Sequence, residues 1–179
     1  MIVNPGNLDK RIYVMEYRDG EWKNSGILWA NVEYTAKVVY STFAAGAEGY
    51  KLKVRANNLV KLDSALRVCG KHCMIAALRV DSRYVEIDAA VVAPQKCILR
   101  RQNADVSAFV GVFAERYVRW TQETPNAKHE TGLLLITPKV IELRPGDIIA
   151  AMSGRFSVRE CHTLEVTHNA YEIFKTGDA

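Results

Sequence analysis

Two stretches of the chain resemble each other, and this internal match constrains the fold more than any other feature of the sequence. Residues 59–70 read LVKLDSALRVCG, and residues 140–154 read VIELRPGDIIAAMSG. Both have two apolar residues, a charge, a leucine, a turn, an apolar strand and a glycine. The match continues through KHCMIAALRVDSRYVEI and RFSVRECHTLEVTHNAYEI, which differ by two residues of loop. A match of this length indicates that one structural unit occurs twice.

Upstream residues extend the match. Lys10-Arg11-Ile12 aligns with Lys96-Cys97-Ile98, and an alternating apolar series of the first copy aligns with one of the second copy. The aligned series are Leu28, Ala30, Val32 and Tyr34 in the first copy and Ala108, Val110, Val112 and Ala114 in the second. We therefore predict a tandem duplication of roughly residues 8–92 and 94–176. The corresponding domains are residues 1–92 and residues 93–179.

Short alternating apolar segments separated by turn residues dominate both copies and predict an all-β fold. Each copy is large enough for a small β-barrel or sandwich, with long loops between strands. One segment, residues 106–120, leaves an alternative open. Its apolar residues fall at helical spacing after the possible cap Asp105, whereas its sister segment alternates as a strand. We expect a strand for residues 106–114, because a duplication preserves the core, and a helix is the alternative.

The stretch CGKHC, residues 69–73, suggests a metal or redox site at first sight. In the repeat it corresponds to Ser153-Gly154-Arg155-Phe156-Ser157, so Gly-Lys and Gly-Arg are predicted hairpin turns and the cysteines replace serines. Zinc sites need four ligands at spacings such as C-x2-C, and the second copy has no equivalent. We predict a turn, with no metal site and no cofactor.

The histidines of the second copy are interpreted in the same way. His162 and His168 bracket residues 163–167, TLEVT, which alternate as a plain strand. We expect both histidines to be surface or hairpin residues. Four cysteines without an apolar leader segment favour reduced thiols in a cytosolic setting.

One strand differs in character between the copies. Residues 50–55, YKLKVR, alternate with Lys51, Lys53 and Arg55 facing outward, whereas the sister stretch TGLLLI, residues 131–136, has Leu134 and Ile136 outward. A strand that is apolar on both faces is normally buried on both. We predict that Leu134 and Ile136 pack on another domain or subunit, or else beneath a loop of their own copy. The basic stripe is a solvated face, or it lines a DNA channel with weak, salt-sensitive contacts.

Residues 38–49, VVYSTFAAGAEG, are small, glycine-rich and only weakly periodic, and they predict a long loop. Long loops are uncommon unless they bind something or become ordered on assembly. We expect this loop to contact a partner chain. The residues expected to make that contact are Val38, Val39, Tyr40, Phe43, Gly46 and Gly49.

No catalytic motif is visible in the sequence, which disfavours an enzyme. Glu86 and Asp88 share a strand face, but Glu172 stands alone in the other copy. The net charge of +4 is spread evenly, since residues 1–93 carry 13 Lys+Arg and 10 Asp+Glu and residues 94–179 carry 11 and 10. An even distribution does not indicate a dedicated nucleic-acid binder. No apolar run reaches the roughly 20 residues that cross a bilayer.

The N-terminal half resembles a known family. Leu8-Asp9-Lys10-Arg11-Ile12, within NPGNLDKRI, and Trp29-Ala30-Asn31-Val32-Glu33 resemble the L-D-K-R-I opening and the W-A-x-V-E strand of tailed-phage head–tail adaptor proteins. These are also called head-closure, head-completion or connector proteins. The likeness covers residues 4–92, and its order continues with an Ala/Gly-rich loop, an alternating strand and a Gly-Lys hairpin. The second half lacks both motifs, and a duplicated barrel departs from the single-domain family pattern.

The resemblance implies a small β-barrel in a ring of the virion neck, assembled in the host cytoplasm. Such a ring joins the portal or adaptor above to the tail terminator and tail proteins below, extends the DNA channel and helps retain the packaged genome. It implies that the loop at residues 38–49 reaches into the channel or towards neighbouring subunits. It implies no catalytic residues and only non-specific contact with DNA. Head connectors are twelve-fold and tails six-fold, so a ring of six duplicated chains would present twelve similar barrels. A ring of twelve chains is the alternative.

Two other functions remain open at this point. A tail terminator or another neck protein differs from the connector only by its place in the particle. A nucleic-acid-binding module of the OB kind belongs to a different class, and it would need aromatic and basic side chains on one exposed face. Tyr50 beside Lys51, Lys53 and Arg55 is a thin version of such a face.

Overall fold

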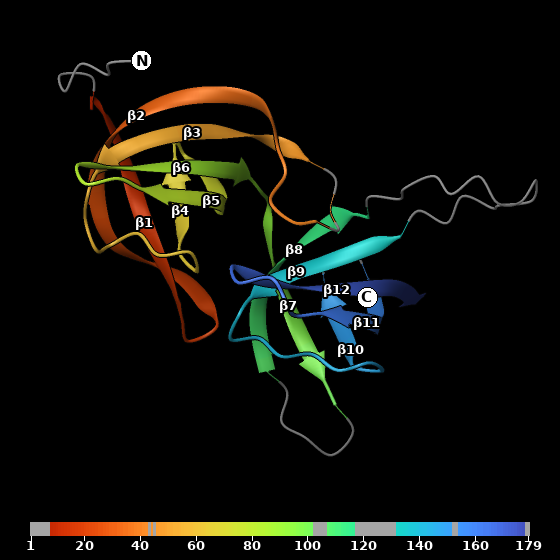
Figure 1. The fold of residues 1–179 in the computed structure, drawn as a ribbon. Coiled ribbons are helices and arrows are strands. Elements are labelled where there is room, and N and C mark those ends of the chain that lie inside the picture. The colour runs from red at the N-terminus through yellow and green to blue at the C-terminus, as the bar shows by residue number, and fades with distance from the viewer. Residues whose placement is uncertain are drawn as a thin grey trace, which may run out of the picture.

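The chain folds as two all-β units, which a computed structural model describes for residues 8–42, 44, 46–101, 107–116, 132–151 and 154–177. The first unit contains β1 (Lys10–Arg18), β2 (Glu21–Val38), β3 (Ala47–Arg55), β4 (Ala65–Val68), β5 (Lys71–Val80) and β6 (Tyr84–Val91). The second contains β7 (Pro94–Arg100), β8 (Ser107–Glu115), β9 (Leu133–Pro138), β10 (Ile148–Ala151), β11 (Gly154–His162) and β12 (His168–Gly177). The all-β prediction is confirmed (Figure 1).

Both units are closed antiparallel barrels with the same strand order. The first runs β1-β2-β3-β6-β5-β4 and the second runs β7-β8-β9-β12-β11-β10, and in each the first strand pairs with the fourth to close the ring. An irregularity recurs as well, since the register of β5 on β6 shifts between Ile75 and Ala77 and that of β11 on β12 between Val158 and Glu160. A shared bulge and a shared topology support the interpretation that one unit was duplicated.

Each barrel has its own apolar core, which the alternation of the strands produces. In the first barrel Ile12, Val14 and Leu52 point inward and are at most 2% exposed. In the second barrel Leu135 and Tyr171 hold equivalent places and are fully buried. Side chains alternate along a strand, so the outward positions remain for other contacts.

The CGKHC stretch forms a hairpin turn between β4 and β5. Val68 pairs with Lys71 across the turn, and Cys69 and Gly70 both have left-handed backbone angles, with φ of 49° and 81°. Two successive residues with positive φ are the geometry of a type I′ hairpin. The predicted turn is confirmed for the first copy.

The sequence alignment at this turn is wrong by one residue. In the second barrel Ala151 pairs with Gly154, so the turn falls on residues 152–153, outside the described residues, and Gly154 belongs to β11. The core counterpart of Cys73 is Phe156, not Ser157, because Leu66 pairs with Cys73 and Ile149 with Phe156. Both side chains lie in their barrel cores.

The same error affects β2 and β8. Ile12 pairs with Leu28, and its counterpart Cys97 pairs with Phe109. The inward counterparts of Leu28, Ala30 and Val32 are therefore Phe109, Gly111 and Phe113. A shift of one residue exchanges the two faces of a strand, but β8 has apolar or small residues on both faces, so alternation did not reveal the shift.

Two further expectations are resolved by the strands. Residues 107–115 form strand β8, so the helical alternative is wrong there, and residues 117–120 lie outside the described residues. The predicted strand at residues 163–167 is also wrong, since this stretch is the loop between β11 and β12. Its alternating polar residues include Glu165. The Glu165 carboxylate accepts a hydrogen bond from the backbone N–H of Thr42 in the first barrel, and the stretch pairs with no strand.

Candidate functional site

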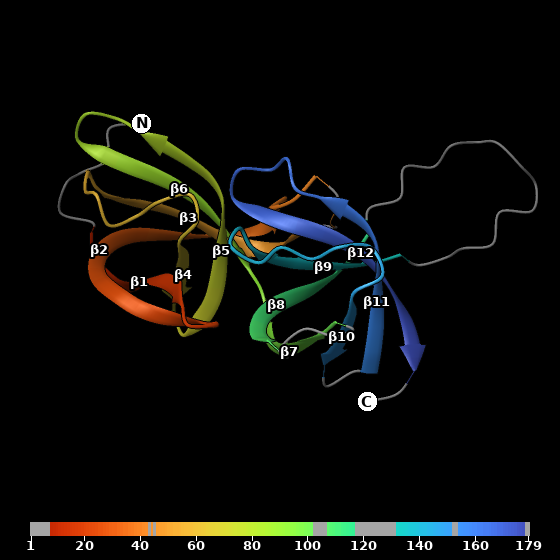
Figure 2. The same ribbon diagram turned by 90° about the horizontal axis from the view of Figure 1, so that it is seen from below.

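The outer face of β8, β9 and β12 meets the first barrel in a third apolar cluster, which we call the inter-barrel cluster. Figure 2 shows β5 and β6 of the first barrel running up to the second barrel at this junction. The second barrel contributes Val112, Leu134, Ile136 and Ala170, and the first contributes Val38, Tyr40, Ala44, Met74 and Ala90. Burial of these side chains ties the two barrels together, because apolar area removed from water stabilises the contact.

Leu134 and Ile136 lie at the centre of this cluster, and both are fully buried. Their outward face packs on the first barrel of the same chain. The structure therefore places them at a domain contact. It does not leave them available to a neighbouring subunit, which was the other possibility.

The loop after β2 packs on the second barrel of the same chain, while the expectation that it reaches a channel or a neighbouring subunit stays a prediction. Val38, Tyr40 and Ala44 are 7%, 6% and 3% exposed, and Ala44 forms an isolated β-bridge with Arg116. Val39 is 58% exposed. The physical reason is that the apolar outer face of β9 lies within reach and offers more burial than solvent does.

The remaining residues predicted for this loop have other places. Phe43 lies outside the described residues. Gly46 precedes β3, and Gly49 lies within β3. A Cβ on Gly49 would lie 2.2 Å from the carbonyl oxygen of Ala89 and 2.6 Å from Val38 Cγ2. A side chain at this position would therefore clash with the backbone of β6 and with Val38, and glycine leaves room for both.

A polar clamp flanks the inter-barrel cluster. The Thr42 backbone N–H and Oγ1 donate to Glu165 Oε1 at 2.8 and 2.6 Å, and Ser41 Oγ donates to the same oxygen at 3.4 Å. The buried His168 ring lies against the other carboxylate oxygen, Glu165 Oε2, and its centroid is 6.5 Å from that of Tyr40. We call Ser41, Thr42, Glu165 and His168 the clamp.

Burial and hydrogen bonding shift the clamp's pKa values. Burial acts to raise the pKa of Glu165, but the hydrogen bonds from Thr42, with His168 and Ser41, outweigh it and lower the pKa. Burial lowers the pKa of His168, against the opposing effect of Glu165. Burial also raises the pKa of Tyr40 to about 12. At neutral pH the clamp therefore holds a carboxylate and a neutral imidazole.

The predicted basic stripe is interleaved with acidic groups. Lys53 Nζ lies 3.2 Å from Glu86 Oε1 and 5.0 Å from the Tyr84 ring centroid. Lys51 stands opposite Asp88 on one neighbouring strand and Glu33 on the other. These carboxylates reduce the positive potential that the stripe would present to phosphates, which weakens the case for a DNA-contacting surface.

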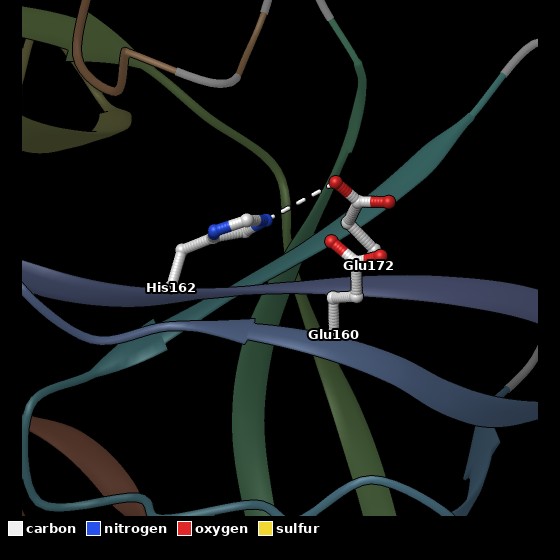
Figure 3. A group of neighbouring side chains, drawn as sticks. All are labelled: Glu160, His162 and Glu172. Carbon is white, nitrogen blue, oxygen red and sulfur yellow. Dashed lines mark hydrogen bonds and ion pairs between the residues drawn. The ribbon is translucent and has the colours of Figure 1, made fainter.

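A second group of polar side chains lies on the outer face of the second barrel, and the sequence did not indicate it. Glu160, His162 and Glu172 have ligand atoms that all lie within 4.8 Å of one another (Figure 3). Glu172 accepts from Arg116 Nη1 at 2.9 Å, and His162 Nε2 lies 3.1 Å from Glu172 Oε1. Glu172 is thus not alone on its face, because Glu160 stands directly opposite it. Only strand pairing brings these residues together.

The two family-like motifs lie on adjacent strands of the first barrel. Arg11 pairs with Trp29 and Lys10 with Ala30, and the Arg11 guanidinium carbon lies 5.1 Å from the Trp29 ring centroid. Trp29 is 50% exposed and borders an open groove of about 580 Å³ that Ile27 and Arg55 also line.

Comparisons with models of protein families, with curated proteins and with solved structures find no match to this chain. No helix in the described part of the chain is long and apolar enough to cross a bilayer.

Proposed function

We propose that this chain is a structural virion protein of the tailed-phage neck, which joins the DNA-filled head to the tail and helps retain the packaged genome. The observation that carries the proposal is the pairing of its two motifs. L-D-K-R-I leads into β1 and W-A-x-V-E lies in β2, and Arg11 and Trp29 stack across the two strands. The two motifs that carry the resemblance thus lie side by side in one structural unit, a small closed β-barrel of the kind that the resemblance implies.

The proposed assembly is a cyclic ring of six or twelve copies between the portal or adaptor and the tail terminator. The two barrels of a chain enter it as one unit, because the inter-barrel cluster and the clamp join them. Leu134 and Ile136 are covered within the chain, so the contact between chains has to use another surface. A cyclic ring needs two different complementary patches on each chain.

Deletion of the gene from the phage or prophage tests this proposal. Electron microscopy should show DNA-filled or leaking heads beside free, complete tails, and plasmid-borne wild-type protein should restore joined particles. Joined, infectious virions without the protein would refute a joining role. Filled heads with tails of irregular length would instead place the protein at the tail terminator.

A second candidate, a module that binds single-stranded nucleic acid, is favoured by one observation. Trp29 and Tyr13 are 50% and 37% exposed on the outer face of β1 and β2, with Arg11 between them. Exposed aromatic rings beside arginines provide stacking and phosphate contacts. Fluorescence anisotropy with a labelled oligonucleotide at physiological salt separates the candidates. Tight binding that Trp29→Ala abolishes would favour the module, and no binding would favour the connector.

A further inference from the structure

We propose that Glu160, His162 and Glu172 form a binding site for a divalent transition-metal ion such as Zn²⁺ or Co²⁺. The site lies on β11 and β12, outside the inter-barrel cluster and the clamp, and it does not depend on the function proposed above. The three side chains rise from two adjacent strands on the same face of the barrel (Figure 3). One imidazole and two carboxylates are ligands that suit such ions.

A bulge in β11 creates this arrangement. Val158 pairs with Ile173, and the next pair is Glu160 with Glu172, so the shift skips Arg159. Regular pairing would have placed Arg159 opposite Glu172, an ordinary pair of opposite charges. The bulge places two carboxylates face to face instead, and bulges commonly re-aim side chains next to functional sites.

Two like charges directly opposite each other on a sheet destabilise it unless a cation lies nearby. Arg116 supplies one for Glu172, at the carboxylate oxygen Oε2. Within the described ranges of the chain, no ion pair joins Glu160 to a basic side chain. A metal ion would neutralise both carboxylates, using Glu172 Oε1 while Arg116 holds Oε2.

The distances suit metal ligation after small side-chain rotations. Two ligands about 2.1 Å from a tetrahedral ion lie roughly 3.4 Å from each other. His162 Nε2 and Glu172 Oε1 are already 3.1 Å apart, and Glu160 has a ligand atom within 4.8 Å of both. Glu172 is 6% exposed and held by Arg116, so it provides a fixed ligand, whereas the exposed Glu160 can rotate onto the ion.

The first barrel shows the alternative chemistry at equivalent positions. Its shared bulge places Ala77 opposite Asp88, and Arg79 Nη2 lies 3.3 Å from Asp88 Oδ2. Ala77 thus corresponds to Glu160, Arg79 to His162 and Asp88 to Glu172. The first barrel neutralises its carboxylate with a permanent cation. The second barrel replaces that cation with a metal-binding imidazole and adds another carboxylate.

Isothermal titration calorimetry of the full reduced chain with ZnCl₂ tests the site, with the visible absorption of Co²⁺ as an independent readout of ligand geometry. One ion should bind per chain. His162→Arg and Glu160→Ala introduce the side chains that the first barrel has at these positions. Each should weaken Zn²⁺ binding by at least about tenfold. Glu172 is left unchanged, because its loss would leave Arg116 unpaired and confuse folding with binding.

Two controls keep the outcome specific. Cys69→Ser removes an exposed thiol that could take up zinc by itself, and Glu33→Gln removes an exposed carboxylate of the other barrel. Neither should change the affinity. Circular dichroism should show that every variant folds without metal. Absence of Zn²⁺ and Co²⁺ binding to the wild type, or equal binding by His162→Arg and Glu160→Ala, would overturn the proposal.

Discussion

The same outer face, formed by equivalent strands, is charged in one barrel and apolar in the other. It comprises β2, β3 and β6 in the first barrel and β8, β9 and β12 in the second. The strand pairing within each barrel shows which outward positions are equivalent. The counterparts, first barrel then second, are Asn31 and Val112, Glu33 and Ala114, Lys51 and Leu134, Lys53 and Ile136, Glu86 and Ala170, and Asp88 and Glu172. The interior of each barrel holds an apolar core.

This difference shows that the interior determines the barrel, whereas the outer face determines which surfaces meet. The apolar face of the second barrel is covered by Met74, Ala90 and the loop after β2. The charged face of the first barrel is open, with Lys53 and Glu86 paired across it. The apolar outer face of the second barrel is therefore buried by the contact within the chain.

Exchanging outward residues between the charged face of the first barrel and the apolar face of the second should change the free energy of unfolding most. Ile136→Lys gives the second barrel the residue of the first, and it should lower the free energy of unfolding by about 3–5 kcal/mol because the new charge is buried without a partner. Urea denaturation followed by circular dichroism measures this. If that variant does not fold, Ile136→Ala should still cost about 2–4 kcal/mol.

The reciprocal change is the matched control. Lys53→Ile gives the first barrel the residue of the second, and it should change the free energy of unfolding by less than about 1 kcal/mol, since it removes only a partly exposed ion pair. Equal costs for Lys53→Ile and Ile136→Lys would contradict the difference between the faces.

Removing the side chain that covers the apolar face should be the next largest effect. Tyr40→Ala should cost about 3 kcal/mol, because it leaves a cavity in the inter-barrel cluster. It should also split one calorimetric unfolding transition into two, one for each barrel. Val39→Ala, at an exposed neighbouring position, should keep a single transition at nearly the wild-type temperature.

The dependence of stability on pH should reveal another difference between the barrels. It arises at a position where the first barrel has His72 and the second has Arg155. Burial, reinforced by Arg67, lowers the pKa of His72 to about 4. The unfolded chain then binds the extra proton first, so the stability due to neutral His72 is complete above about pH 6.5 and is lost as the pH falls towards 4.

His72→Gln should reduce the loss of stability between pH 6.5 and 4 by roughly 1–2 kcal/mol. Denaturation at several pH values measures the slope. His168 also has a lowered pKa, so part of the wild-type slope should remain. An unchanged slope in the variant would show that His72 does not titrate in this range.

The clamp should contribute least to the free energy of unfolding. Glu165→Gln should cost about 1 kcal/mol at pH 7, because the hydrogen bonds from Thr42 lose their charged acceptor. The pKa of Glu165 is lowered in the fold, so this contribution should be present above about pH 4.5 and disappear as the pH falls further. Glu142→Gln, at an exposed carboxylate, should cost nothing measurable by the same urea titration.

The sequence indicated the all-β fold, most of the strands, the turn at Cys69 and Gly70, and the face on which Leu134 and Ile136 lie. These features are local, because alternation and turn chemistry act over a few residues. The register between copies was wrong by one residue, because β8 has apolar or small residues on both faces and alternation then cannot tell the faces apart.

The tertiary structure alone decided what covers the apolar face and which polar side chains meet. Thr42 and Glu165 are separated by 123 residues, and only the docking of the barrels brings them to 2.6 Å. Glu160 and Glu172 face each other because a bulge skips Arg159, a backbone event that no side-chain pattern encodes. The sequence by itself determined two barrels with apolar interiors, because burial follows local periodicity. Their mutual contact and the carboxylate–histidine cluster depended on long-range pairing.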